Sequence, residues 1–324
     1  MTSATARIAA GRRRVPESLR WGIGLAFATA LISGVSIYVN GFAVKQLPDA
    51  AIFTTLKNAV AALILVGLAA ATVRPADVRA MDRTSWTRLA LIGVVGGSVP
   101  FILFFSGLAM ASAPSAAFIH KTLFVWVAIM AVPFLGERLG KAQLGALGVL
   151  LAAQFLVIPP NGVDWGTGET MIAAATLLWA VEAILAKRLL SSVPSPVVGA
   201  GRLGIGLLVL VGYLLISGKA GTILALSGTQ WLWALGTGFL LFGYVGTWYA
   251  ALKRAPASLV TAILVVGAPI TAGLQAFQKG ALPAAPVLAG QLLIGVAAIA
   301  LAVYAIRVAS RTPSQAASTT SASA

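Results

Sequence analysis

Long apolar stretches alternate with short polar links along most of the chain. A helix needs about 20 apolar residues to cross the hydrocarbon core of a bilayer. The pattern therefore predicts an all-α integral membrane protein with ten transmembrane helices. The expected helices span residues 21–44, 50–73, 88–110, 113–135, 141–158, 168–188, 195–217, 229–252, 256–278 and 284–306.

Composition supports a membrane protein and excludes several kinds of site. Of the 324 residues, 59% are hydrophobic and 10% are charged, whereas a soluble domain is about half apolar and a quarter charged. The absence of cysteine excludes disulfides and thiolate sites, and the single histidine, His120, excludes a multi-histidine metal site. We therefore expect no metal and no cofactor.

The basic residues are distributed unevenly between the two sides of the predicted helices. If the N-terminus is cytoplasmic, 17 Lys and Arg residues fall on that side, against only Lys45, Lys219 and Lys279 on the other. This bias predicts a multi-pass protein of the plasma membrane (the inner membrane of the cell) with both termini cytoplasmic. The net charge of +15 then reflects topology, and we expect no nucleic-acid partner.

The sequence also divides into two similar halves. Residues 107–119 (GLAMASAPSAAFI) and 249–261 (YAALKRAPASLVT) each contain a helix end, an Ala-Pro link and the start of a new apolar helix. The helix-two segment around Lys57 matches the helix-seven segment around Arg202. Because five helices per half is an odd number, the second half is inverted in the membrane, an arrangement suited to alternating access.

This organisation predicts four segments. Residues 1–20 form a basic cytoplasmic segment, and residues 21–158 form the first five-helix repeat. Residues 168–306 form the second repeat. Residues 307–324 form a cytoplasmic tail, expected to be disordered because TPSQAASTTSASA is small and polar.

Two motifs carry a resemblance to a known family. They are FLGERLGKAQLGALGVLLA at 134–152 and LKRAPASLV at 252–260. Together with the five-plus-five helices, they resemble the drug/metabolite transporter superfamily, and its EamA-type members in particular, over about residues 21–306. Glu137 in FLGERL is the most specific feature, and Lys279 stands at its ungapped counterpart in the second half. The resemblance implies a secondary transporter, not an enzyme, that moves metabolites, amino-acid-like solutes or drugs, often by export.

Five ionisable side chains lie inside the predicted helices, where charge is costly and indicates function: Lys57, His120, Lys121, Glu182 and Arg202. Glu182 on helix six and Arg202 on helix seven lie at nearly the same depth, which predicts an ion pair. The pair could be structural. Alternatively, Glu182 could couple transport to protons, because it is the only acidic residue deep inside a predicted helix.

Lys57 and Lys121 lie in the outer half, where no acidic residue shares their depth. Lys57 could extend to the outer surface, Lys121 could bond to backbone carbonyls, and His120 could be a neutral imidazole bonded to a neighbouring helix. His120 and Lys121 align with Ala262 and Ile263, so they break the repeat. We therefore expect His120 and Lys121, with Lys57, to form the substrate end of a central cavity for an anionic or zwitterionic solute.

Three aromatic residues, Trp179, Trp126 and Tyr244, are further candidates to line the substrate site or simply to pack helices. Two other classes of function remain open. An intramembrane serine enzyme would pair Ser98 with His120, but it leaves the repeat unexplained. The third class is a structural or sensory membrane protein. No Walker motif indicates ATP hydrolysis. The chain is expected to contact membrane lipid as a monomer or homodimer.

Overall fold

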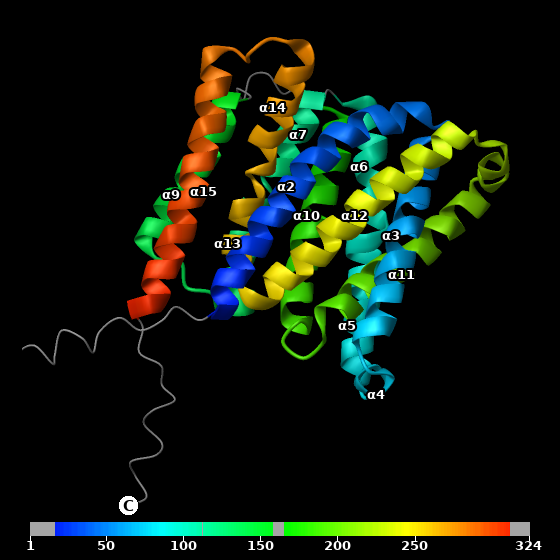
Figure 1. Cartoon of the computed structure of the whole chain (residues 1–324), viewed down its shortest axis with the longest axis horizontal. Coiled ribbons are helices and arrows are strands. Elements are labelled where there is room, and N and C mark those ends of the chain that lie inside the picture. Colours follow the sequence, from blue (N-terminus) through cyan, green and yellow to red (C-terminus); the bar gives the residue numbers. More distant parts are fainter. Residues whose placement is uncertain (1–16, 112, 158–164, 312–324) are drawn as a thin grey trace, which may run out of the picture.

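The computed structural model describes residues 17–111, 113–157 and 165–311, and this part of the chain is helical throughout, joined by short turns (Figure 1). Most of the basic segment 1–20 and of the tail 307–324 lies outside the described residues. The helices are α2 (Glu17–Gln46), α3 (Ala50–Thr72), α4 (Pro75–Arg79), α5 (Arg83–Gly97), α6 (Val99–Met110), α7 (Ala113–Lys121), α8 (Leu123–Leu135), α9 (Lys141–Val157), α10 (Thr167–Leu189), α11 (Ser195–Ile216), the 3₁₀ helix η2 (Ala220–Ala225), α12 (Gly228–Arg254), α13 (Ala257–Leu264), α14 (Gly267–Lys279) and α15 (Ala285–Arg311).

These helices supply the expected membrane spans. Within the described residues, nine spans are long and apolar enough to cross a bilayer. The shorter apolar helix α9 matches the predicted helix at 141–158 and brings the number to ten. Some boundaries differ from the prediction. The third span begins at residue 83 instead of 88 because Asp82 caps it, accepting a hydrogen bond from the Ser85 N–H at 3.0 Å. The last helix continues to Arg311, so it includes the start of the predicted tail.

Among the described residues, three spans are broken in the middle. The third breaks at Ser98, just before Pro100, which lacks a backbone N–H. The fourth breaks at Thr122, whose hydroxyl donates to the Ile119 carbonyl at 2.7 Å, and the ninth breaks between α13 and α14. The breaks in spans four and nine occupy equivalent places in the two repeats. The break at Ser98 has no counterpart in the continuous helix α12.

The two halves interlock. Helix α2 packs against α12, and the equivalent pair in the inverted repeat, α10 and α6, packs in the same way. Helices α3 and α11 pack against each other, as do α9 and α15, which lie side by side at one edge (Figure 1). Because these contacts join opposite halves, neither half can move without sliding along the other.

The ends of spans four and nine correct one repeat assignment. Both spans end at a glycine in the left-handed region, Gly136 with φ 67° and Gly280 with φ 63°, which L side chains disfavour. When these glycines are superimposed, Glu137 corresponds to Ala281, and Lys279 corresponds to Leu135. Lys279 is therefore not the counterpart of Glu137, because span nine has two more residues than span four between its Ala-Pro link and this glycine.

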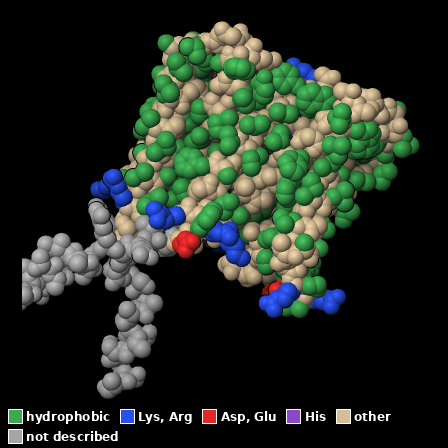
Figure 2. Space-filling view, viewed as in Figure 1, with side chains coloured by type: hydrophobic (Ala, Val, Ile, Leu, Met, Phe, Trp, Pro, Cys, Tyr) green, Lys and Arg blue, Asp and Glu red, His purple; other side chains and the backbone are tan. Residues whose placement is uncertain are grey.

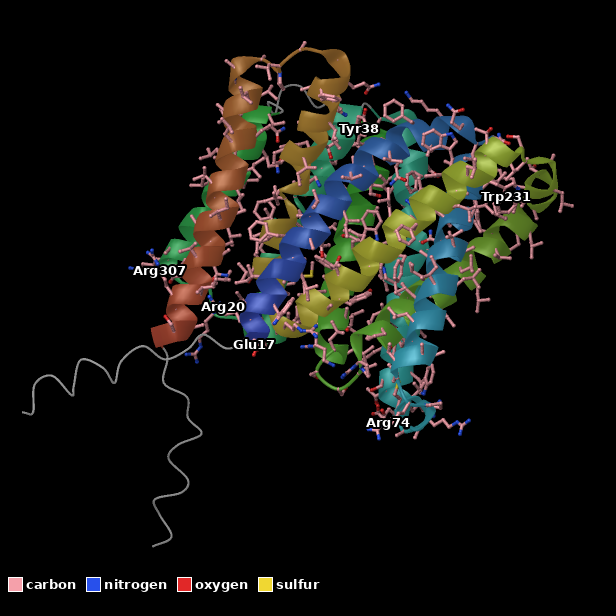
Figure 3. The ribbon with its side chains drawn as sticks, in the orientation of Figure 1. Glu17, Arg20, Tyr38, Arg74, Trp231 and Arg307 are labelled. Carbon is pink, nitrogen blue, oxygen red and sulfur yellow. The ribbon has the colours of Figure 1, made fainter. Side chains whose placement is uncertain are left out.

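Apolar side chains cover the middle of the face shown in Figure 2, and Lys and Arg side chains gather along its lower edge. Arg20, Arg74 and Arg307 lie toward this end, whereas Tyr38 and Trp231 lie toward the opposite end (Figure 3). A polar edge beneath an apolar band is the distribution that a bilayer requires. The surface thus agrees with a multi-pass membrane protein.

Helices α5 and α11 make the closest backbone approach at the centre of the bundle. A Cβ atom at Gly206 of α11 would lie 2.8 Å from the Gly97 Cα of α5 and closer still to the Gly97 carbonyl. Backbone atoms cannot move aside as a flexible side chain can. The crossing therefore depends on glycine at both positions.

Gly206→Ala should destabilise the protein by about 1–3 kcal/mol, because the added methyl group forces α5 and α11 apart. Gly204→Ala on the same helix is the matched control, since its Cβ would meet nothing within 4 Å. That variant should stay within about 1 kcal/mol of wild type. Thermal melting of both variants in detergent checks the difference, and equal Tm values would contradict the close crossing.

Candidate functional site

Two groups of side chains meet near the middle of the bundle. We call the first the aromatic cluster, and it consists of Phe101, Phe104, Phe105, His120 and Trp179. We call the second the charged network, and it consists of Glu182, Arg202 and Tyr249 around the Gly96 carbonyl. The first group comes from α6, α7 and α10, and the second from α5, α10, α11 and α12.

In the aromatic cluster, the His120 ring lies between two other rings. Its centroid is 5.1 Å from that of Trp179 and 5.2 Å from that of Phe104, with edge-to-face geometry in both pairs. Such arrangements are favourable beyond simple burial. The Nδ1 atom of His120 is buried and has no hydrogen-bond partner among the described residues.

Lys57 and Lys121 are both buried, with 3% and 9% of their surfaces exposed. The Lys57 ammonium lies 5.2 Å from the Phe53 ring centroid and 5.4 Å from that of Phe105. Lys57 therefore does not extend to the surface, and cation–π contact with two rings stabilises it in the interior. In the part of the chain that the structure describes, neither lysine has an ion pair or a hydrogen bond from its ammonium.

The carboxylate of Asp49, at the start of α3, is already paired with another lysine. Asp49 caps α3 by accepting from the Ala51 N–H at 2.7 Å, and its other oxygen lies 2.7 Å from the Lys219 Nζ. Burial opposes ionisation of Asp49, but the hydrogen bonds from Lys219 and Ala51 lower its pKa below the ordinary value. Asp49 thus remains ionised and paired with Lys219 at neutral pH, which leaves both buried lysines without a carboxylate.

The charged network corrects the predicted ion pair. Within the described residues, no Glu182 oxygen lies within 4.0 Å of an Arg202 nitrogen. Instead the Tyr249 hydroxyl donates to Glu182, and the Arg202 Nη2 donates to the Gly96 carbonyl at 3.1 Å. The guanidinium carbon of Arg202 lies 5.8 Å from the Tyr249 ring centroid. Tyr249 therefore lies beside both charged groups, which do not contact each other directly.

Gly96 makes room for the charged network. A Cβ atom at this position would overlap the Glu182 side chain and lie 3.2 Å from the Arg202 Nε. The Arg202 Nε is buried without a hydrogen-bond partner among the described residues. Glycine at position 96 therefore allows two charged side chains to pack against the α5 backbone.

Trp179 links the two groups. Its ring belongs to the aromatic cluster, and its Nε1 donates at 3.1 Å to the same Gly96 carbonyl that accepts from Arg202. Trp179 and Glu182 are three residues apart on one face of α10. Trp179 therefore contacts the His120 ring and also shares the Gly96 carbonyl with Arg202.

The remaining candidates lie outside these two groups. Tyr244 stacks on Trp248 of the same helix, with centroids 6.2 Å apart. Trp126 is 40% exposed and donates to the Thr122 hydroxyl at 3.1 Å, so it faces the surroundings of the protein and is not brought to the predicted substrate end. The Ser98 hydroxyl donates to the carbonyls of Gly93 and Val94 and not to His120, the contact that the enzyme alternative would need.

Sequence reasoning missed Tyr249 and the three phenylalanines of α6. Tyr249 lies near the C-terminal end of α12, at the depth expected for Glu182, and this shared depth was the signal that could have identified it. The phenylalanines gave no signal because apolar residues are common throughout a membrane helix. Among the described residues, no group of three or more His, Cys, Asp or Glu side chains is placed to hold a metal ion.

Comparison with known proteins gives one family and one fold. A family model described as the EamA-like transporter family matches residues 20–158 and 166–304. A solved crystal structure, described only as that of a protein, superimposes with a TM-score of 0.73 at 17% identity. The match covers 89% of this chain and 98% of the other, and at this identity it shows the fold alone. No curated protein matches the chain.

Tyr249→Phe should lower stability by about 1–3 kcal/mol, because the buried Glu182 carboxylate loses the hydroxyl that donates to it. Tyr244→Phe is the matched control on α12, since no hydrogen bond of its hydroxyl to a described residue is present. Thermal melting in detergent should show a lower Tm for Tyr249→Phe alone. Equal Tm values for the two variants would exclude Tyr249 as the residue that supports Glu182.

Proposed function

The chain belongs to the EamA-like transporter family, and from this premise we propose that it carries a small solute across the plasma membrane by alternating access between its two halves. One observation above all supports this proposal: two buried lysines without a carboxylate partner flank an aromatic cluster between the halves. An unpaired charge in a membrane interior is costly, and a charged solute can offset that cost. By family resemblance, the direction we propose is export.

The substrate end consists of Lys57, His120 and Lys121. Lys121 is the last residue of α7, so its ammonium lies where a helix C-terminus already favours positive charge. A carboxylate or phosphate on the solute would interact far more strongly with a desolvated ammonium than with one in water. The neighbouring rings of Phe104 and Trp179 suit an apolar or aromatic portion of the same solute.

Glu182 has two roles to distinguish within this proposal. As a coupling residue, it would bind and release a proton as the halves exchange, and Tyr249 would hold it in position. As a structural residue, it would only offset the charge of Arg202. The connection through Trp179 favours coupling, because solute contact at His120 would then act on the Gly96 carbonyl that holds Arg202.

Lys121→Met should weaken transport of anionic solutes at least tenfold, while a neutral analogue of the same shape is less affected. The physical reason is the loss of a buried charge with little change in volume. Counterflow in proteoliposomes with a panel of carboxylated, phosphorylated and neutral metabolites measures this ratio. Lys57→Met tests the second cation in the same assay.

Lys45→Met provides the control for the counterflow assay, because Lys45 is an exposed cation at the end of α2. Lys45→Met should leave the preference for anionic over neutral solutes unchanged. Equal loss for anionic and neutral solutes in Lys121→Met, or no loss for either, would reject charge recognition at this position. Absence of counterflow for the whole panel in the wild type would count against transport itself.

We also propose that both termini face the cytoplasm, as the 17-to-3 distribution of basic residues favours. The natural chain has no cysteine, so single cysteines report topology without background. A cysteine at Lys279 should react with an impermeant maleimide from outside the cell, and one at Arg254 should not. The reverse labelling would overturn the orientation.

A further inference from the structure

A pocket of about 660 Å³ opens at the end of the molecule that carries the basic residues. It lies among the ends of α8, α10 and α12 and the start of α5. Four cationic side chains line it: Arg88, Lys187, Arg188 and Arg254. This pocket is separate from the aromatic cluster and the charged network, and the transport proposal does not use it.

Neutral backbone carbonyls hold two of these cations in place. Lys187 donates to the carbonyls of Leu252 and Ala255, at 2.5 and 2.7 Å, at the end of α12. Arg188 donates through Nε to the Phe134 carbonyl at 2.9 Å, at the end of α8. These bonds satisfy helix C-termini without adding a full negative charge. They orient the cations without neutralising them, and the one carboxylate that acts on the Lys187 charge is Glu137.

The other two cations have hydrogen-bond donors that are not used within the described part of the protein. Arg254 uses Nη1 on the Ala250 carbonyl at 2.8 Å, so its remaining guanidinium donors have no partner in the described part of the protein. Arg88 makes no hydrogen bond or ion pair there. A guanidinium with free donors is well suited to bind phosphate through two parallel hydrogen bonds.

A single carboxylate, Glu137, lies in the wall of the pocket, and its oxygens are already occupied. They accept from the Ala257 N–H at 2.5 Å, from the Ser258 N–H at 3.2 Å and from the Ser258 hydroxyl. Glu137 therefore caps the first turn of α13 and interacts with that helix terminus. The lining therefore has four cations and one carboxylate, which already accepts hydrogen bonds from α13, so the pocket is strongly positive.

We propose that this pocket binds the phosphate of an anionic phospholipid headgroup. Phe134, which is 52% exposed, lies in the same wall, so the cations adjoin an apolar surface that would contact acyl chains. Basic pockets between helices at the cytoplasmic side of a membrane recognise such headgroups. A bound phosphate would bridge α5, α10 and α12 and hold their ends together.

The test compares three ligands on the purified full-length protein in detergent. These are dioleoyl-phosphatidylglycerol, dioleoyl-phosphatidylcholine and inorganic phosphate, each titrated while the Tm is measured. Phosphatidylglycerol should raise the Tm by about 4 °C at saturation, and phosphatidylcholine should not. The double variant R88Q/R254Q should lose this rise, whereas R79Q/R307Q, which removes two exposed cations outside the pocket, should retain it.

Each outcome decides the proposal. Selective stabilisation by phosphatidylglycerol that is lost only in R88Q/R254Q supports a lipid site. Stabilisation by inorganic phosphate alone, lost in the same variant, would replace the lipid with a soluble phosphate compound and overturn the lipid assignment. A rise that survives in R88Q/R254Q, or no rise with any ligand, would reject the pocket as an anion site.

Discussion

The crossing of α5 and α11 is the constraint on which the centre of the protein depends. Gly97 and Gly206 bring two backbones into direct contact, and the neighbouring Gly96 opens the space that Glu182 and Arg202 occupy. The Gly96 carbonyl then accepts from both Trp179 and Arg202. One tight crossing thereby links an aromatic cluster, a buried carboxylate and a buried guanidinium.

The two repeats share their helix packing but differ in the chemistry they carry. Both have a broken span, at Thr122 in the first half and between α13 and α14 in the second. Of these two breaks, only the first adjoins a lysine, Lys121, because the segment AILV at 262–265 beside the second break has no ionisable side chain. The ends differ as well. Glu137 caps α13 at one end, whereas Asp49 and Lys219 form an ion pair at the other. The two ends of the bundle therefore carry different contacts.

The architecture was predictable because bilayer thickness fixes helix length, and the repeat with its odd helix number predicts inversion. The locations of the buried charges followed from the same reasoning. The partner of Glu182 was not predictable, because depth along a helix says nothing about rotation around it. Tyr249 therefore took the place that a direct ion pair was expected to fill.

Rotation around the helix axis also explains Trp126, which lies in a predicted helix but faces outward. The break at Ser98 depends on the local backbone, and the GGSVP sequence indicated a hinge without fixing its position.

Alternating access requires that the distances between the two halves change in opposite senses at the two ends of the bundle. Arg138 follows span four, and Ser191 follows span six. The equivalent positions of the inverted repeat lie at the other end, near Lys279 after span nine and near Lys45 after span one. Because the chain has no cysteine, spin labels can be placed at either pair alone and distances measured in proteoliposomes by electron paramagnetic resonance. With a transported solute, we expect one distance to lengthen and the other to shorten. Distances that stay fixed, or that change in the same sense, would contradict alternating access between the two halves.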